Sequence, residues 1–171
     1  MTMNANDILT RLRYALDIKD AEMVEIFALG GIETTKAEVQ DMLSKSKNSP
    51  DGAAADEEYV KMIDNKTLES FLNGCVTLKR GPQEETPETV KNQFLMRDDN
   101  RNMNNILLKK LKIALSLTSE EMIDILHDAG VTVSKSELSA VLRKEGHRNY
   151  KECGDRYARN FLKGLAHIYR A

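Results

Sequence analysis

The chain contains the segment ILTRLRYALDIKDAEMVEIFALGGIETTKAEVQDMLSK at residues 8–45 and the related segment LLKKLKIALSLTSEEMIDILHDAGVTVSKSELSAVLRK at residues 107–144. The two segments align without a gap at an offset of 99, and twelve of the 38 aligned positions are identical. A further match at an offset of 90 pairs FLNG at residues 71–74 with FLKG at residues 161–164. Self-similarity of this kind is typical of a repeated structural unit. The sequence therefore predicts one module present in two tandem copies.

The change of offset from 99 to 90 indicates an insertion of nine residues in the first copy. The insertion lies at about residues 46–60, around the polar stretch SKNSPDGAAADEE. Proline disrupts helix interiors, and Pro50 falls in this insertion while Pro82 and Pro87 fall between the copies. We expect the first helical repeat at residues 5–80, a linker at 81–102 and the second helical repeat at 103–171.

Composition and helix-start patterns both favour an all-helical protein. Apolar residues make up 41% of the chain and charged residues 30%, which is a globular balance, whereas aromatic residues make up only 5%. A β-sandwich normally has more β-branched, aromatic and turn-forming residues. Capping-box pairs at Thr35 and Glu38, at Thr118 and Glu121, and at Ser134 and Glu137 mark three helix starts.

Apolar residues recur at the three- and four-residue spacing of amphipathic helices, four in each copy. In the first copy the expected core positions are Ile8, Leu9, Leu12, Ala15 and Leu16; Met23, Ile26 and Phe27; Val39, Met42 and Leu43; and Leu68, Phe71, Leu72 and Cys75. In the second copy they are Leu107, Leu108, Leu111, Ala114 and Leu115; Met122, Ile125 and Leu126; Leu138, Val141 and Leu142; and Phe161, Leu162, Leu165 and Ile168. So short a module buries only a modest core by itself. The predicted fold is all-α, two tandem copies of a four-helix module packed together.

Four glycines recur at equivalent places in the two copies. Gly31 and Gly130 follow the second helix, where glycine adopts the left-handed conformation that ends many helices. Gly74 and Gly164 fall inside the fourth helix, where glycine costs about 1 kcal/mol relative to alanine. Because both copies carry this cost, we expect a neighbouring helix to approach the backbone closely there.

Several motifs of the second copy resemble those of a known family. They are Asn104-Asn105-Ile106, Lys109-Lys110-Leu111, Ile113-Ala114-Leu115-Ser116-Leu117, and Glu152-Cys153-Gly154-Asp155 followed by Phe161-Leu162-x-Gly164-Leu165. In these motifs the chain resembles the bacterial YehS-like proteins, a family of unknown function built from two tandem repeats. The resemblance covers nearly the whole chain and departs from the family in the insertion and the long linker. It implies a bacterial, cytoplasmic protein of two repeats, and it implies no activity.

The net charge of −2 conceals an asymmetry between the copies, because residues 6–80 sum to −4, residues 81–102 to −2 and residues 103–171 to +4. The candidate contact residues of the second copy are Lys135, Arg143, Lys144, Arg148, Lys151, Arg156, Arg159 and Lys163. With interleaved tyrosines, such residues suit a nucleic-acid surface. The alternative is an ordinary solvated face, or a patch that faces the acidic first copy.

Residues 121–130 and 134–144 also have the outline of a helix-turn-helix, and residues 22–31 and 35–45 repeat it. The second helix of that outline would enter the major groove of DNA. It carries Lys135 and Arg143, but also Glu137, which would repel phosphates. The same outline arises in many unrelated helical bundles, so both interpretations of the element stay open.

No catalytic, cofactor-binding or metal-binding motif is predicted. Phosphate-binding loops, dinucleotide fingerprints and metalloprotease motifs are missing from the sequence, and no two of its three histidines have the i, i+4 spacing of a helical metal site. Cys75 lies on an apolar stripe and is expected in the core. Cys153 lies beside an expected helix start, which lowers a thiol pKa, and is a candidate reactive thiol. A capped, inert thiol is the favoured interpretation.

The amino-terminal residues lack the apolar core of a secretion signal, and no run of 18 apolar residues exists. We therefore expect a cytoplasmic protein with no membrane association and no cofactor. The favoured function is a non-enzymatic protein-interaction module that binds a protein partner or a second copy of itself. The alternative is a nucleic-acid-binding or regulatory protein that uses the helix-turn-helix-like element and the basic face of the second repeat. A third hypothesis, an enzyme, would need a polar pocket at the junction of the two copies.

Overall fold

The computed structural model describes residues 3–46, 58–82, 84–91 and 93–170. Across these residues the chain forms nine helices and no strand, so the predicted all-α fold is confirmed. The helices are α1 (Ala5–Ala15), α2 (Asp20–Leu29), α3 (Lys36–Leu43), α4 (Asn65–Arg80), α5 (Pro87–Lys91), α6 (Met103–Ala114), α7 (Ser119–Asp128), α8 (Lys135–Leu142) and α9 (Asp155–Tyr169). Most of the expected insertion, residues 47–57, lies outside the described residues.

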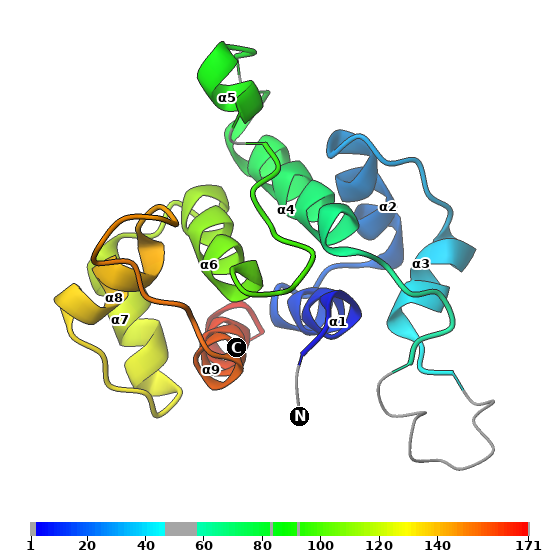
Figure 1. Ribbon diagram of the computed structural model, residues 1–171. Coiled ribbons are helices and arrows are strands. Elements are labelled where there is room, and N and C mark those ends of the chain that lie inside the picture. Colours follow the sequence, from blue (N-terminus) through cyan, green and yellow to red (C-terminus); the bar gives the residue numbers. More distant parts are fainter. Residues whose placement is uncertain (1–2, 47–57, 83, 92, 171) are drawn as a thin grey trace.

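The helices form two equivalent modules, α1–α4 and α6–α9, that pack against each other as predicted. In Figure 1 helices α1, α4, α6 and α9 occupy the centre, α2 and α3 flank them on one side, and α7 and α8 on the other. Helix α1 packs on α9, and α6 packs on α4. Helix α1 is equivalent to α6, and α4 is equivalent to α9. Exchanging the two modules therefore converts the α1–α9 contact into the α6–α4 contact. The interface is therefore self-complementary, as in a two-fold dimer.

Capping residues and turn residues explain where the helices begin and end. Thr118 Oγ1 accepts the N–H of Glu121 at 3.1 Å, and the Glu121 carboxylate accepts the N–H of Thr118 at 2.9 Å. Helix α8 begins with an equivalent pair, so the predicted capping boxes of α7 and α8 are confirmed. At α3 the Glu38 N–H donates to Thr35 Oγ1 at 3.1 Å, but the Glu38 carboxylate pairs with Lys61, so that predicted box forms only in part. Gly31 and Gly130 both have φ of 94°, which confirms the predicted left-handed helix ends.

The core is one continuous apolar cluster that runs through both modules. Among its largest members Phe27 and Phe71 pack with ring centroids 4.9 Å apart. Most predicted core positions are buried, but Ile168 is 56% exposed, so that prediction is wrong. Residues 167–170 are all exposed, so the buried face of α9 ends before its last turn.

The helix-interior glycines lie against a neighbouring helix, as predicted. A Cβ atom built on Gly74 would overlap the carbonyl oxygen of Ile26 in α2, and one built on Gly164 would overlap that of Ile125 in α7. Ile26 and Ile125 are themselves equivalent residues. The same close contact between the second and fourth helices therefore forms in each module, and a methyl group would push the helices apart.

A buried asparagine joins the third helix of each module to the start of the fourth. In the second module Asn105 Nδ2 donates to the carbonyl oxygens of Val141 at 2.9 Å and Lys151 at 2.8 Å. Its Oδ1 accepts the N–H of Cys153 at 2.9 Å. In the first module Asn6 makes the three equivalent bonds, to Met42, Lys61 and Ile63. These bonds satisfy backbone groups that burial would otherwise leave unpaired.

Candidate functional site

Two hollows lie at equivalent places in the two-fold arrangement, one beside α4 and α6 and one beside α1 and α9, hereafter grooves. The first is lined on its helices by Asn73, Val76, Thr77, Lys110 and Ile113. The second, hereafter the α1/α9 groove, is lined by Thr10, Arg11, Tyr14, Leu162, Lys163, Ala166, His167 and Arg170. The two grooves differ in what covers them, and that difference makes the second one a candidate site.

A segment of the chain itself covers the α4/α6 groove. The backbone N–H groups of Leu95 and Met96 donate to the Glu69 carboxylate at 2.7 and 2.8 Å. The carbonyl oxygen of Gln93 accepts from Asn73 Nδ2 at 2.8 Å and from Lys110 Nζ at 2.8 Å. Side chains of α4 and α6 thus hold the main chain of a non-helical segment, residues 93–96.

A buried ion pair lies beneath this segment. Lys110 Nζ is 2.8 Å from Glu69 Oε2, and the two side chains are 8% and 1% exposed. Lys110 also donates to Asn73 Oδ1 at 2.6 Å. Burial lowers the pKa of Lys110, and the hydrogen bond and charge of Glu69 oppose that shift. Each charge is therefore compensated by its partner and by the main chain of the covering segment.

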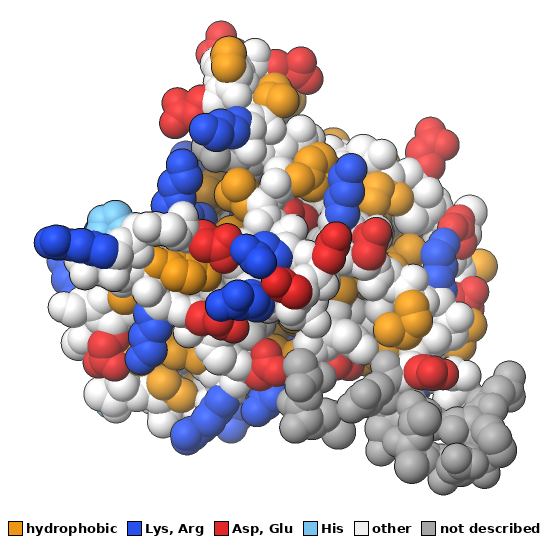
Figure 2. Space-filling view, viewed as in Figure 1, with side chains coloured by type: hydrophobic (Ala, Val, Ile, Leu, Met, Phe, Trp, Pro, Cys, Tyr) orange, Lys and Arg blue, Asp and Glu red, His pale blue; other side chains and the backbone are white. Residues whose placement is uncertain are grey.

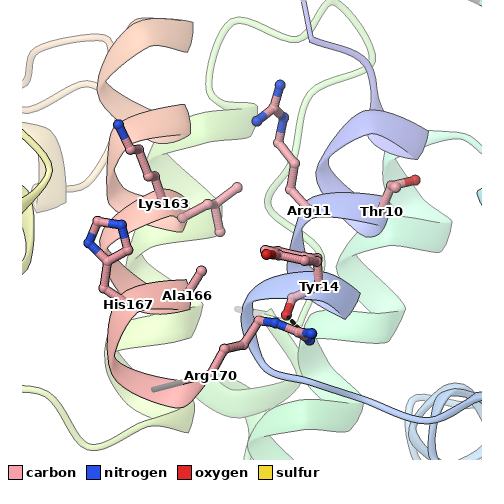
Figure 3. A pocket seen from close by; sticks show the side chains of 8 residues that line it. Thr10, Arg11, Tyr14, Lys163, Ala166, His167 and Arg170 are labelled. Carbon is pink, nitrogen blue, oxygen red and sulfur yellow. Dashed lines mark hydrogen bonds between the residues drawn. The ribbon is translucent and has the colours of Figure 1, made fainter.

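The α1/α9 groove is a hollow of about 820 Å³ lined by α1, α9 and Arg170. Figure 3 shows Arg11 and Tyr14 on α1 facing Lys163, Ala166 and His167 on α9. Leu162 and Ala166 give it an apolar wall, and the ring of Tyr14, which is 60% exposed, lies on the opposite side. An apolar surface with a few convergent polar groups is typical of a binding pocket.

Arg170 closes one end of this groove. Its Nη1 donates to the Tyr14 carbonyl oxygen at 3.1 Å and to Asp17 Oδ1 at 2.9 Å, and its guanidinium lies 4.2 Å from the Tyr14 ring centroid. The equivalent residue of the first module, Arg80, donates to Ser116 Oγ at 2.8 Å. Arg170 therefore holds Tyr14 in place and is itself already paired.

An adjoining hollow of about 400 Å³ extends the groove, because it shares Thr10 and Arg11 and adds Arg159. Arg11, Arg159 and Lys163, hereafter the basic triplet, form no ion pair with any residue that the structure describes. The carboxylate that lines the extension, Asp7, already accepts from the Tyr59 hydroxyl at 2.6 Å and the Asn4 N–H at 3.0 Å. The basic triplet outnumbers this single carboxylate, so the groove and its extension carry a net positive charge.

The structure distributes the eight basic candidate residues over different surfaces. Lys135 forms an ion pair with Glu120 at 3.1 Å. The others divide as follows: Arg159 and Lys163 at the α1/α9 groove and its extension, Lys151 and Arg156 at a hollow beside the start of α9, Arg143 and Lys144 at a third hollow near Leu95, and Arg148 exposed in the turn before α9. Lys and Arg side chains alternate with Asp and Glu side chains over the face in Figure 2.

Cys153 lies just before α9, beside a helix start as predicted, but its thiol is buried. Burial, with a smaller contribution from the charge of Asp155, raises the pKa of Cys153 to about 12. Burial likewise raises the pKa of the core residue Cys75 to about 12. Since the thiolate is the nucleophile, these environments favour the inert interpretation. Within the described ranges no cluster of His, Cys, Asp or Glu is placed to hold a metal ion.

Arg11 and Tyr14 were not among the residues predicted from the sequence, because the basic excess lies in the second copy and both residues belong to the first. A signal was present in the repeat alignment. Arg159 stands where the first copy has Glu69, and Arg11 stands where the second copy has Lys110. The Glu–Lys pair of one groove therefore becomes two arginines in the other, and this charge reversal marks the α1/α9 groove as different.

The family described as "Protein of unknown function (DUF1456)" matches residues 5–81 and 104–171. These segments correspond closely to the two helical modules. The chain is also 38% identical over 164 residues to the uncharacterized protein YehS of Escherichia coli (strain K12), covering 96% of this chain and 95% of that protein. No solved structure matches the chain. None of the helices in the described part is long and apolar enough to span a membrane.

Proposed function

We propose that this chain, which belongs to the DUF1456 family of proteins of unknown function, is a non-enzymatic protein-interaction module. The family membership confirms the resemblance to YehS-like proteins. The observation that carries the proposal is the difference between two equivalent grooves. Residues 93–96 cover the α4/α6 groove, whereas the α1/α9 groove is lined by its two helices and Arg170. A fold that already holds one peptide segment in such a groove offers the second groove to a partner.

The surface of the α1/α9 groove supports this proposal. Exposed tyrosine and arginine are enriched at protein interfaces, and Tyr14 and Arg11 both line the groove. Arg170 fixes the position of Tyr14 in the absence of a partner, so less side-chain entropy is lost on binding. The proposal therefore places the interface on both modules at once, since each contributes one helix.

Selection of displayed random peptides against the full chain tests this function. The variant Ala166→Trp fills the α1/α9 groove, and Ala37→Trp places the same side chain on the exposed surface of α3 as a control. Peptides selected on the unchanged chain are expected to bind Ala166→Trp at least about tenfold more weakly, a difference of about 1.4 kcal/mol. Equal binding to both variants would remove this groove as the interface.

The alternative function is nucleic-acid binding or regulation through the basic residues of the second module. Helices α7 and α8 keep the predicted order, and Arg143, Lys144 and Arg148 are exposed. Mobility shift with random duplex DNA and with RNA across a salt series tests it. Micromolar binding that weakens steeply with salt would favour the alternative, and no shift at low salt would exclude it. The cytoplasmic location stays a prediction of the sequence.

A further inference from the structure

We infer that the α1/α9 groove binds a non-helical peptide segment of a partner protein that carries acidic side chains. The inference rests on the proposed interaction function and adds the chemistry of the partner. It follows from comparing the basic triplet with the equivalent residues of the α4/α6 groove, whose occupant is known.

The occupant of the α4/α6 groove is a peptide held mainly by its backbone. Asn73 and Lys110 donate to the carbonyl oxygen of Gln93, and Glu69 accepts two consecutive N–H groups. The equivalent positions in the α1/α9 groove are Lys163, Arg11 and Arg159. Because helix positions and spacing are preserved, these side chains lie where they can reach the main chain and side chains of a segment on the same path.

The change from Glu69 in one groove to Arg159 in the other decides which segment fits. In the α4/α6 groove Glu69 supplies two acceptor oxygens, which match backbone N–H groups. Arg159 replaces it with donors alone, and Arg11 and Lys163 are donors as well. A bound segment must therefore supply the acceptors, and carboxylates pair best with guanidinium groups because both are planar and bidentate. The basic triplet thus selects Asp or Glu side chains.

The apolar part of the groove adds a second requirement. Leu162 and Ala166 on α9 and Tyr14 on α1 line the same hollow as Arg11 and Lys163. In the other groove, Met96 of the bound segment packs against the core. We therefore expect an apolar side chain of the partner to lie between Tyr14 and α9, with its acidic residues toward Arg11 and Arg159.

Fluorescence anisotropy with labelled peptide pools tests the inference. One pool has degenerate positions around a central Leu flanked by fixed Asp or Glu residues, and a matched pool has Asn or Gln at the fixed positions. The full chain is expected to bind the acidic pool at least about tenfold more tightly than the amide pool, and the difference should shrink as salt is raised. A basic pool with Lys or Arg at the fixed positions completes the set.

Charge reversal of the basic triplet supplies the decisive variant. The variant Arg11→Glu/Arg159→Glu/Lys163→Glu is expected to bind the acidic pool at least about tenfold more weakly than the unchanged chain does. It is also expected to bind the basic pool more tightly than the unchanged chain does. The control variant Lys135→Glu/Arg148→Glu/Lys112→Glu makes the same charge change outside the groove and should keep acidic binding. Circular dichroism of both variants verifies that their helices remain folded, and gain of the basic pool is a signal that misfolding would not produce.

The outcomes separate this inference from the proposed function. Equal binding of acidic and amide pools, with loss of both in Ala166→Trp, would keep the interaction function and overturn the acidic specificity. Loss of acidic binding in the control variant alone would place the site elsewhere. Self-association that the charge-reversed variant loses would assign a second copy as occupant, and nucleic-acid binding that it loses would assign phosphates. Each of these results, or no binding by any pool, overturns the inference.

Discussion

Asn6 and Asn105 show how much of the fold depends on single buried polar side chains. Each closes its module by bonding backbone groups from two segments that are distant in the sequence. Their exposed fractions are 0% and 3%, so water does not substitute for these bonds. The asparagines are identical at the offset of 99, just before the aligned segments, yet their partners lie 36 or more residues away. The role of these two side chains was not predicted from the sequence, and only the tertiary contacts reveal it.

We expect the substitution Asn105→Leu to lower the free energy of unfolding by about 3 kcal/mol, because it leaves two carbonyl oxygens and one N–H buried without partners. Urea denaturation followed by circular dichroism measures the change. Asn149→Leu, at an exposed turn position, is the control and should change stability by less than about 0.5 kcal/mol. A loss for Asn105→Leu as small as that of the control would contradict the bonding role.

The two cysteines give a second test at the level of single residues. Since burial raises the pKa of Cys75 and Cys153 to about 12, neither thiol should react measurably with a disulfide reagent at pH 8, and both should react in urea. Each thiol ionises near its ordinary pKa of 9.0 once unfolded, so the stability of the fold should fall as the pH rises above that value. Fast modification of one thiol in the folded protein would restore Cys153 as a reactive residue.

At the scale of elements, each module repeats the packing of its second helix on its fourth, and the segment between α4 and α6 breaks the symmetry. Apolar periodicity predicted the helices and their buried faces, because both are local properties. Periodicity did not predict that residues 93–96 would lie in a groove. That contact depends on Glu69 and Lys110, which are far apart in the chain and charged, so a sequence pattern places both on a solvated surface.

We expect Lys110→Met to destabilise the fold by about 3–5 kcal/mol, because the Glu69 carboxylate would stay buried without its cation. The double variant Glu69→Gln/Lys110→Met should recover a large part of that loss, since it removes both charges together. Lys112→Met on the same helix is the control. The single variant Glu69→Gln completes the cycle. Urea denaturation of the five proteins measures the coupling, and additive losses in the double variant would show that the pair is not coupled.

At the scale of the whole molecule, the modules complete each other. The central helices α1, α4, α6 and α9 form the interface, and one apolar cluster runs through both halves (Figure 1). A separated module would expose the faces of its first and fourth helices. The tandem copies therefore behave as an internal two-fold dimer whose subunits share one chain.

The shared core predicts a single cooperative unfolding transition for the full chain. Far-ultraviolet circular dichroism, which reports on all helices, and tyrosine fluorescence should give coincident urea midpoints. The variant Leu111→Ala in α6 alters one module only. It should nevertheless lower the free energy of unfolding by the same amount, about 2–5 kcal/mol, whichever signal is followed. Two separated transitions, or a shift confined to one probe, would show that the modules fold independently.

The sequence by itself determined the eight helices of the two modules, the capping boxes of α7 and α8, the duplication and the close contacts at Gly74 and Gly164, but not α5, which lies in the predicted linker. Each of these depends on neighbours within a turn or two, or on self-similarity that one chain displays. Only the tertiary structure decided that the modules pair by an approximate two-fold, that residues 93–96 cover one groove, and that the basic triplet lies beside the other. Those features depend on contacts between α1 and α9 and between α4 and α6, which are far apart in the sequence. The free energy of such long-range contacts produces no periodic pattern of residues.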